Sequence, residues 1–215
     1  MAILIGGKST RFGSDKGLYE FQHRPLISYQ LDTLSQVNSD IFLVAYSAKQ
    51  VQDYISKIDL NKIMAFLIDD IEIAHEKNSH TPLRGLYTTF KELKKLDYKK
   101  VLTLACDTPL IQQNVIELII EQSKDYDCCI PKWDNGFLEP LFAIYPIKKS
   151  YYKAKKNLKT GNLKLTYLLS SEWKINYLSI QNSIKKLDNT LKSFFNVNRI
   201  NDIEELMRIY EDLNK

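Results

Sequence analysis

A short apolar segment that runs directly into paired glycines is the feature that most constrains the fold of this chain. Residues 3–5 are apolar, Gly6 and Gly7 follow, and the next positions carry hydroxyl and basic side chains, including Arg11 and Lys16. Such a segment predicts a buried strand that enters a tight loop, where glycines let a ligand approach the main chain. Exposed N–H groups in this loop, beside two fixed positive charges, indicate a site for the phosphates of a nucleotide. The alternative is a glycine turn with a solvated basic flank.

Two common phosphate-binding loops do not fit this segment. A P-loop needs a glycine five residues before Gly7, where the chain has Ala2. The dinucleotide fingerprint needs the spacing G-x-G-x-x-G after the strand, whereas the glycines here fall at positions 6, 7 and 13. The loop is therefore expected to bind phosphate in a different way.

Beyond this loop, apolar runs alternate with amphipathic ones down to about residue 125, which is typical of β-α-β units around a parallel sheet. Further strands are expected at residues 41–45, 64–68, 101–105, 127–131 and 173–180, and at 138–145 after a hairpin turn at Asn135-Gly136. Helices are expected from Pro25, over 48–57, from Pro82, over 111–123, from 163, and at the end of the chain.

Composition and charge narrow the class of protein. The 215 residues fit one large domain, the hydrophobic content of 44% can fill a substantial core, and the net charge of +4 is too small to indicate nucleic acid. No apolar run approaches the length of a membrane span, and no signal peptide is expected before the first strand. The three cysteines lack C-x-x-C spacing and suggest neither a disulfide nor a zinc site, so a cytoplasmic protein is expected.

Two acidic positions at the ends of predicted strands are candidates for ligand binding. Asp69-Asp70 follows the run 64–68, and Asp107 follows the run 101–105 and precedes a proline turn. In open parallel sheets, ligands bind beyond the carboxyl ends of the strands. Because Mg²⁺ prefers one or two carboxylates together with phosphate oxygens, Asp107 is a candidate metal ligand. The alternatives are a turn or helix-start carboxylate for Asp70 and an Asx-turn acid for Asp107.

Three further features are candidates for substrate contact. Thr81 and Pro82 predict a helix start whose N–H groups could face a nucleotide, and Gly85 would allow close approach of a base or ribose; simple helix capping is compatible with this role. Asn196 and Asn198 by themselves indicate a turn at a strand end, although their side-chain oxygens are of a type that can complete a metal or phosphate shell. The lysine-rich run 147–164 could attract an anion, although a solvated helix face is the favoured interpretation.

Several segments together resemble one family. Residues 6–16 are similar to the N-terminal signature of molybdenum cofactor guanylyltransferases, G-G-x-S-x-R-M-G-x-D-K, with Phe12 in place of the methionine. Residues 81–86 resemble the family's G-P-L-x-G, residues 106–109 match its C-D-x-P, and residues 196–198 match the start of its closing N-V-N-T-P-E-E-L. Sister enzymes that use CTP usually show Ala-Ala-Gly in the first loop, so the double glycine favours a guanine nucleotide.

The resemblance implies a three-layer α/β/α, Rossmann-like nucleotidyltransferase fold with a mostly parallel central sheet. It implies a single domain, 1–215, with a nucleotide-binding half over 1–125 and a substrate-binding half over 126–215. The implied catalytic residues are Arg11, Lys16 and Asp107, of which Asp107 also binds Mg²⁺, with help from Asn198. The implied nucleotide-binding residues are Leu4, Ile5, Gly6, Gly7, Ser9, Lys16, Asp70, Gly85 and Asp107. The implied substrate-binding residues are Glu139, Pro140, Asn196 and Asn198, although an edge strand is the alternative for 139–140.

The activity that the resemblance implies is Mg²⁺-dependent transfer of GMP from GTP to molybdopterin, with or without molybdenum, and release of pyrophosphate. The implied partners are GTP and the molybdopterin cofactor, with transient contact to cofactor-synthesis proteins or apo-molybdoenzymes, and without nucleic acid or membrane. Two alternatives stay open. One is a related nucleotidyltransferase, such as a cytidylyl or sugar-phosphate enzyme, and the other is a non-catalytic nucleotide-binding adaptor in cofactor delivery.

Overall fold

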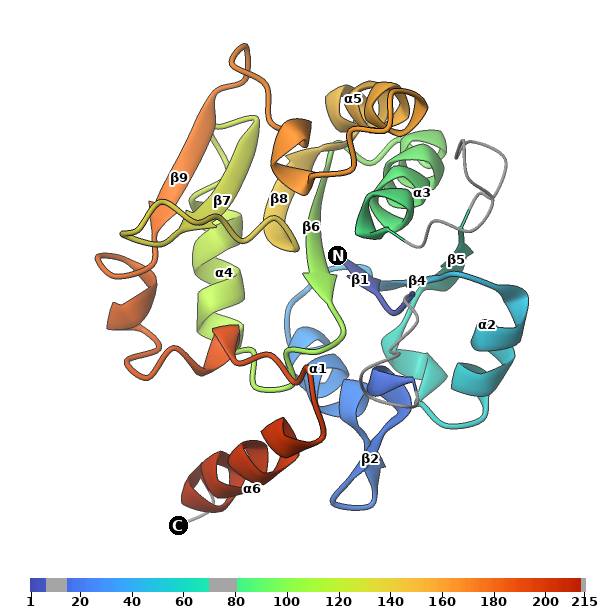
Figure 1. Ribbon diagram of the computed structural model, residues 1–215, viewed down its shortest axis with the longest axis vertical. Coiled ribbons are helices and arrows are strands. Elements are labelled where there is room, and N and C mark those ends of the chain that lie inside the picture. Colours follow the sequence, from blue (N-terminus) through green and yellow to red (C-terminus); the bar gives the residue numbers. More distant parts are fainter. Residues whose placement is uncertain (7–14, 70–80, 214–215) are drawn as a thin grey trace.

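A seven-stranded sheet forms the centre of the protein in a computed structural model that describes residues 1–6, 15–69 and 81–213 (Figure 1). The strands, in the order in which they lie side by side, are β5 (Ala65–Ile68), β4 (Phe42–Ala45), β1 (Ala2–Leu4), β6 (Lys100–Ala105), β8 (Phe142–Pro146), β7 (Cys128–Lys132) and β9 (Ile175–Ser179). All neighbouring pairs are parallel except those that β8 makes with β6 and β7. The predicted mostly parallel sheet is therefore confirmed.

Helices cover both faces of this sheet. On one face lie α1 (Leu26–Leu34), α2 (Ala48–Ile55) and α4 (Gln113–Glu121), which pack on alternate strand residues such as Ile3 and Leu43. On the other face lie α3 (Pro82–Lys95) and α5 (Ile147–Lys159), which pack on the intervening residues such as Leu4 and Val44. Because successive strand residues point to opposite faces, the apolar runs of the sequence supply both cores at once. This is the predicted three-layer α/β/α architecture.

A small third cluster joins the two ends of the chain. The short antiparallel pair β2 (Glu20–Phe21) and β3 (Arg24–Pro25) contributes Phe21, and α6 (Asn201–Leu213) contributes Leu206, with Leu26 and Val197 buried between them. The rings of Phe21, Tyr29 and Tyr210 meet edge to face in the same cluster. Aromatic packing thus holds the final helix beside the segment that follows the first loop.

Local sequence explains how the third helix begins. The hydroxyl of Thr81 accepts a hydrogen bond from the Leu83 N–H, and Pro82 occupies the first turn, as predicted. The buried apolar side chains of α3 follow helical spacing, at positions 83, 86, 87, 90 and 93, and the helix also buries Arg84, Thr88 and Thr89. Within the described residues, no helix combines the length and the apolar character needed to cross a membrane.

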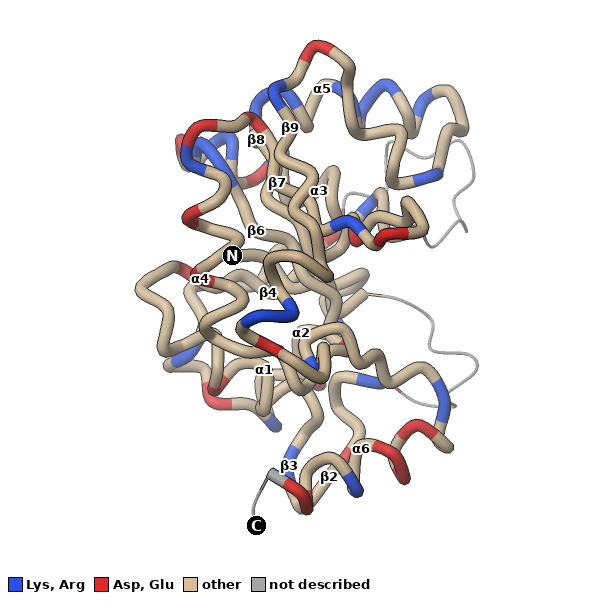
Figure 2. Tube along the Cα trace, turned by 90° about the vertical axis from the view of Figure 1, so that its left-hand side faces the viewer, with Lys and Arg blue, Asp and Glu red and all other residues tan. Residues whose placement is uncertain are grey.

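The lysine-rich run forms α5 at one end of the molecule, opposite α6 (Figures 1 and 2). Lys148, Lys149, Lys156 and Lys159 are exposed, whereas Ala154 and Leu158 are buried against the sheet. Lys149 donates to the carboxylate of Asp127 at 2.5 Å. The exposure of these lysines supports the interpretation of this run as a solvated helix face.

Three expected elements differ from the structure. The strand expected over 138–145 begins only at Phe142, because Pro140 lacks an N–H and the Phe142 N–H donates back to the Glu139 carbonyl in a turn. The helix expected from 163 is a single 3-10 turn, Leu165–Leu168, and Pro25 caps α1 instead of beginning it. The hairpin turn is confirmed, since Gly136 takes a positive φ of 88° and its N–H donates to the Trp133 carbonyl.

Gly85 gives a testable consequence of the close packing between α3 and β1. A Cβ atom at this position would lie 3.1 Å from Cδ2 of Leu4, so the Gly85→Val side chain would overpack the interface and lower the free energy of unfolding by about 1–3 kcal/mol. Urea unfolding would measure this loss. The control is Lys95→Val on the exposed side of the same helix, and an equal loss in both variants would contradict the packing role of Gly85.

Candidate active site

Three polar side chains from distant parts of the chain meet beyond the carboxyl end of β6. The ammonium of Lys16 donates to Oδ2 of Asp107 at 3.1 Å and to Oδ1 of Asn198 at 3.0 Å. The side chains of Lys16 and Asp107 are each only 18% exposed, so water screens this ion pair incompletely. The structure therefore brings together two predicted catalytic residues and one predicted substrate-binding residue.

The sheet explains why Lys16 and Asp107 meet. The strands β1 and β6 are parallel neighbours in which Leu4 pairs with Ala105, so both strands end at the same level. The turn after β6 is then held by Gln30 of α1, whose Nε2 donates to the Ala105 carbonyl and to the Thr108 hydroxyl, each at 3.0 Å. This pairing and this turn present the Asp107 carboxylate at the edge of the sheet.

The C-terminal segment is tied to the same turn. The Val197 N–H donates to the Asp107 carbonyl at 2.8 Å, and the N–H groups of Asn198 and Arg199 donate to the Asp202 carboxylate at 2.6 and 2.8 Å. Asp202 lies in the first turn of α6, where a carboxylate is favoured by the helix dipole. These backbone bonds fix Asn198 beside Asp107, although the two residues are far apart in sequence.

The first loop is described only at its two ends. Gly7, Ser9, Arg11 and Asp70, all predicted site residues, lie outside the described residues. At the near end, the N–H groups of Ile5 and Gly6 both donate to the Val44 carbonyl, at 3.0 and 3.1 Å, and the Leu4 carbonyl accepts from the Cys106 N–H. A nucleotide contact through the N–H groups of Ile5 or Gly6 would therefore have to replace a bond within the protein.

Gly85 allows α3 to pack closely against the sheet. It is buried in α3, and the direction of its missing Cβ atom faces Leu4 and Val44. The close approach that this glycine allows is thus the approach of α3 to the sheet. Contact between Gly85 and a base or ribose stays a prediction.

Two of the residues predicted to bind a second substrate, Glu139 and Asn196, line one small cavity. The cavity has a volume of about 30 Å³ and is also lined by Ala105 and Thr108, the residues that flank the Cys106-Asp107 pair. Glu139 accepts a hydrogen bond from the indole N–H of Trp133 at 2.6 Å. The carbonyl of Pro140 instead accepts from the buried Tyr145 hydroxyl, so Pro140 holds the turn that carries Glu139. Through Ala105 and Thr108, the cavity lies beside the turn that carries Asp107.

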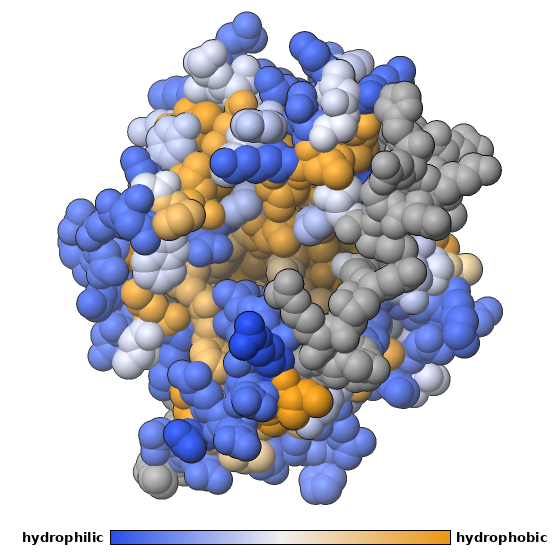
Figure 3. Space-filling view, in the orientation of Figure 1, coloured by the Kyte–Doolittle hydropathy of each residue, from blue (hydrophilic) through white to orange (hydrophobic). Residues whose placement is uncertain are grey.

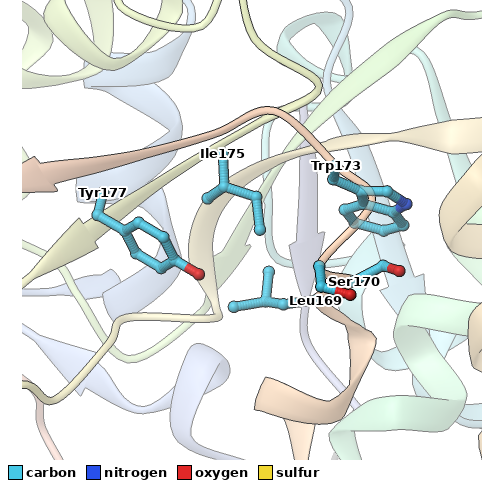
Figure 4. A pocket seen from close by; sticks show the side chains of 6 residues that line it. Leu169, Ser170, Trp173, Ile175 and Tyr177 are labelled. Atoms are coloured by element: carbon cyan, nitrogen blue, oxygen red, sulfur yellow. The ribbon is translucent and has the colours of Figure 1, made fainter.

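The space-filling view shows a hollow in the face of the molecule that Figure 1 presents. It lies over β6 and its neighbouring strands, and hydrophobic residues form its floor (Figure 3). A second cavity, of about 400 Å³, lies at the edge strand β9, where Leu169 and Ile175 separate the rings of Trp173 and Tyr177 (Figure 4). Among the described residues, those that line this second cavity include no Lys, Arg, Asp or Glu and no predicted site residue.

The chemistry of the cluster fits a hard metal ion. Oδ1 of Asp107 is buried and has no hydrogen-bond partner among the described residues, while Oδ2 faces the Lys16 ammonium. With the amide oxygen of Asn198, this carboxylate offers the oxygen ligands that Mg²⁺ prefers. Burial and the neighbouring Asp107 carboxylate raise the pKa of the Cys106 thiol, which therefore stays protonated and is a poor nucleophile.

Sequence reasoning missed three residues that support the site. Gln30, Gln50 and Tyr54 lie in segments whose pattern predicts ordinary amphipathic helices, yet all three are buried and each hydrogen-bonds to a turn of the site. A usable signal existed for the glutamines, since each interrupts the otherwise apolar face of its helix.

Comparisons with known proteins agree with this architecture. A model of the MobA-like NTP transferase domain matches residues 1–171. A protein of Pyrococcus horikoshii named "probable molybdenum cofactor guanylyltransferase" is 31% identical over 94% of this chain and 95% of its own length. A protein of the same name from Natranaerobius thermophilus is 33% identical over 94% and 92%. The crystal structure of molybdopterin-guanine dinucleotide biosynthesis protein A from Archaeoglobus fulgidus has a TM-score of 0.77 and 22% identity, and covers 98% of both chains.

The fold and its family identify a class of enzyme, the nucleotidyltransferases. Within this class, the chain belongs to the MobA-like NTP transferase family, whose model spans most of its length. The resemblance found in the first loop and in the Cys106–Pro109 segment is therefore confirmed.

Glu139 gives a pH-dependent prediction. Burial raises the pKa of Glu139, and the bond from Trp133 opposes this shift. Since the folded carboxyl keeps its proton to higher pH than the unfolded one, Glu139 costs stability as pH rises above its ordinary pKa. Between about pH 4 and pH 7, the Glu139→Gln variant should gain unfolding free energy relative to wild type.

Urea unfolding across this pH range would measure the difference. Trp133→Phe removes the indole donor and leaves the carboxyl, so it should deepen the loss of stability with rising pH. Parallel pH profiles for wild type and Glu139→Gln would contradict the raised pKa.

Proposed function

We propose that the protein transfers GMP from GTP to molybdopterin. In this reaction a phosphate oxygen of molybdopterin attacks the α-phosphorus of GTP, the bond to the β-phosphate oxygen breaks, and pyrophosphate leaves. The product is a guanine dinucleotide form of the cofactor. The observation that carries this proposal is the convergence of Lys16, Asp107 and Asn198 at the carboxyl edge of a nucleotidyltransferase sheet. The names of the curated relatives support the choice of substrates.

The chemistry needs charge neutralisation more than covalent catalysis. Two polyanions must approach each other, and the attacking phosphate is already ionised, so neither a protein nucleophile nor a strong general base is required. Lys16 supplies a fixed positive charge at the site, and Arg11 is proposed to supply a second one. The protonated Cys106 thiol agrees with a reaction in which no side chain is acylated or phosphorylated.

Asp107 and Asn198 are the residues proposed to hold Mg²⁺. Oδ1 of Asp107, which lacks a hydrogen-bond partner in the described parts of the chain, and the amide oxygen of Asn198 would supply two oxygen ligands, and phosphate oxygens and water would complete the shell. When bound, Mg²⁺ would neutralise charge on the transferred phosphoryl group and on the leaving pyrophosphate. Asp107 would align the phosphates with the Lys16 ammonium.

The two halves of the chain are proposed to divide the substrates between them. Residues 1–125 would bind GTP through the first loop, Asp70 and Gly85, and residues 126–215 would bind molybdopterin through Glu139 and Asn196. Glu139 and Asn196 line the same small cavity beside the turn that carries Asp107, and this shared position supports their assignment to one substrate. Asn198 belongs to the second half but contacts Lys16 of the first half. The two proposed halves of the site therefore meet at the Lys16 cluster. Apo-molybdoenzymes or cofactor-synthesis proteins would receive the product by transient contact.

Nucleotide preference can be tested without the second substrate. Thermal unfolding with GTP, CTP, ATP or UTP, each with and without Mg²⁺, should show the largest shift with GTP and Mg²⁺. At about 100 times Kd, the bound nucleotide should add about 2.7 kcal/mol to the free energy of unfolding. A preference for CTP would contradict the guanylyl assignment. A shift with none of the four nucleotides would favour an adaptor with another ligand.

Two substitutions test the catalytic cluster. Lys16→Met and Asp107→Asn keep the approximate shapes of the side chains and remove one charge each, so each should lower turnover about a hundredfold or more. Pyrophosphate release from GTP and molybdopterin measures this loss, and circular dichroism checks that the fold is intact. The matched control is Lys148→Met on the exposed face of α5, which should keep wild-type turnover. Near-normal pyrophosphate release by Asp107→Asn would refute the metal assignment.

A further inference from the structure

A buried polar network lies between α2 and the turn that carries Lys16. The Asp15 carboxylate accepts three hydrogen bonds: from the Tyr54 hydroxyl at 2.7 Å and the Gly17 N–H at 3.0 Å on Oδ1, and from Nε2 of Gln50 at 2.6 Å on Oδ2. Tyr54 and Gln50 are 0% and 2% exposed. Asp15 caps the 3-10 turn η1 (Lys16–Leu18), so these donors act on the backbone next to Lys16.

Gln50 connects three segments at once. Besides its bond to Asp15, Nε2 donates to the Ile5 carbonyl at 2.8 Å, and Oε1 accepts from the Tyr46 N–H at 3.0 Å. Ile5 follows β1 and Tyr46 follows β4, so one amide group bridges the ends of two strands and the start of η1. A buried amide is costly when its polar atoms lack partners, and here both of its polar atoms have them.

The hydroxyl of Tyr54 lies so close to the backbone of Gly17 that Tyr54 does more than fill space in the core. A Cβ atom at position 17 would lie 2.2 Å from the Tyr54 hydroxyl, so only glycine fits between this hydroxyl and the turn. Packing of the ring alone would be satisfied by phenylalanine, because the ring belongs to the apolar cluster under α1 and α2. Burial raises the pKa of Tyr54 well above its ordinary value, so the hydroxyl keeps the proton that it donates to Asp15.

The Lys16 side chain needs such support. A lysine has large rotamer freedom, and its ammonium reaches Asp107 and Asn198 only if the backbone at residue 16 is fixed. The Asp15 cap before Lys16 and the Gly17 N–H after it both belong to the network. The network therefore controls the point from which the Lys16 side chain extends.

We propose that Gln50 and Tyr54 are positioning residues that act through Asp15 to hold Lys16 in the active site. This inference rests on the proposed function, because it gives Lys16 the role of phosphate-neutralising cation. A small displacement of this cation would weaken its contact with the transferred phosphates more than it would weaken substrate binding as a whole. The loss should therefore fall on kcat and spare KM.

The test uses two substitutions with matched controls. Tyr54→Phe removes only the hydroxyl, and Gln50→Met removes the amide at similar length. Their controls are Tyr152→Phe and Gln52→Met, since Tyr152 is exposed on α5 and Gln52 is exposed on α2. Amide hydrogen exchange reports on η1, and pyrophosphate release from GTP and molybdopterin gives kcat and KM.

We expect exchange at the Gly17 and Leu18 amides to become about tenfold faster or more in Tyr54→Phe and Gln50→Met. We expect kcat to fall about tenfold in Tyr54→Phe and about 10- to 100-fold in Gln50→Met, with KM for GTP within about threefold of wild type. The two controls should match wild type in exchange and in kcat.

Unchanged exchange at Gly17 and Leu18 in both variants would overturn the proposal, and so would faster exchange with wild-type kcat. A rise in KM at constant kcat would also overturn it, because that result describes lost binding and not a misplaced cation. The exchange measurement needs no substrate, so it separates this proposal from the proposed function. A wild-type protein without pyrophosphate release would refute the function, and exchange would still decide whether the network holds η1.

Discussion

The contact of one ammonium with two oxygens joins the three parts of the chain that form the site. Lys16 follows the first strand, Asp107 follows β6, and Asn198 precedes the last helix. Lys16 and Asp107 meet because β1 and β6 are adjacent parallel strands that end at the same edge of the sheet. A carboxylate that is mostly buried is costly without a counter-charge, and Lys16 provides it. The fold thus brings a cation and an acid together at the sheet edge, where each provides the counter-charge of the other.

Two buried glutamines connect the helices to the turns at this edge of the sheet. Gln30 of α1 holds the turn after β6, and Gln50 of α2 holds the turn before Lys16. Both side chains bond to backbone carbonyls or to polar side chains at strand ends, where the regular ladder of the sheet stops and polar groups need other partners. The same layer of helices that covers the hydrophobic core therefore also fixes the two charged residues of the cluster.

The sequence predicted those features that depend on local pattern. Apolar runs located the parallel strands, and the rule that ligands bind at their carboxyl ends pointed to Asp107. The pattern could not predict the pairing of β8, which lies antiparallel between β6 and β7 because of contacts some forty residues distant in sequence, such as Thr103 with Ala143. The contact of Lys16 with Asn198 was equally inaccessible, since it joins residues 182 positions apart. The close packing of Gly85 against Leu4 was not predictable either, because a glycine that permits close approach looks the same in a sequence whether a nucleotide or a side chain approaches it.

A lysine suits this position better than an arginine would. The ammonium has three N–H donors that rotate freely, and the contacts to Asp107 and Asn198 use two of them. The planar guanidinium of an arginine would bind the Asp107 carboxylate in a bidentate way, and all of its N–H donors would lie in one plane. The ammonium can instead share its donors among ligands in different directions. In the proposed reaction the same residue must hold the site together before phosphates arrive and contact those phosphates afterwards, and a rotating point charge meets both demands with a small movement.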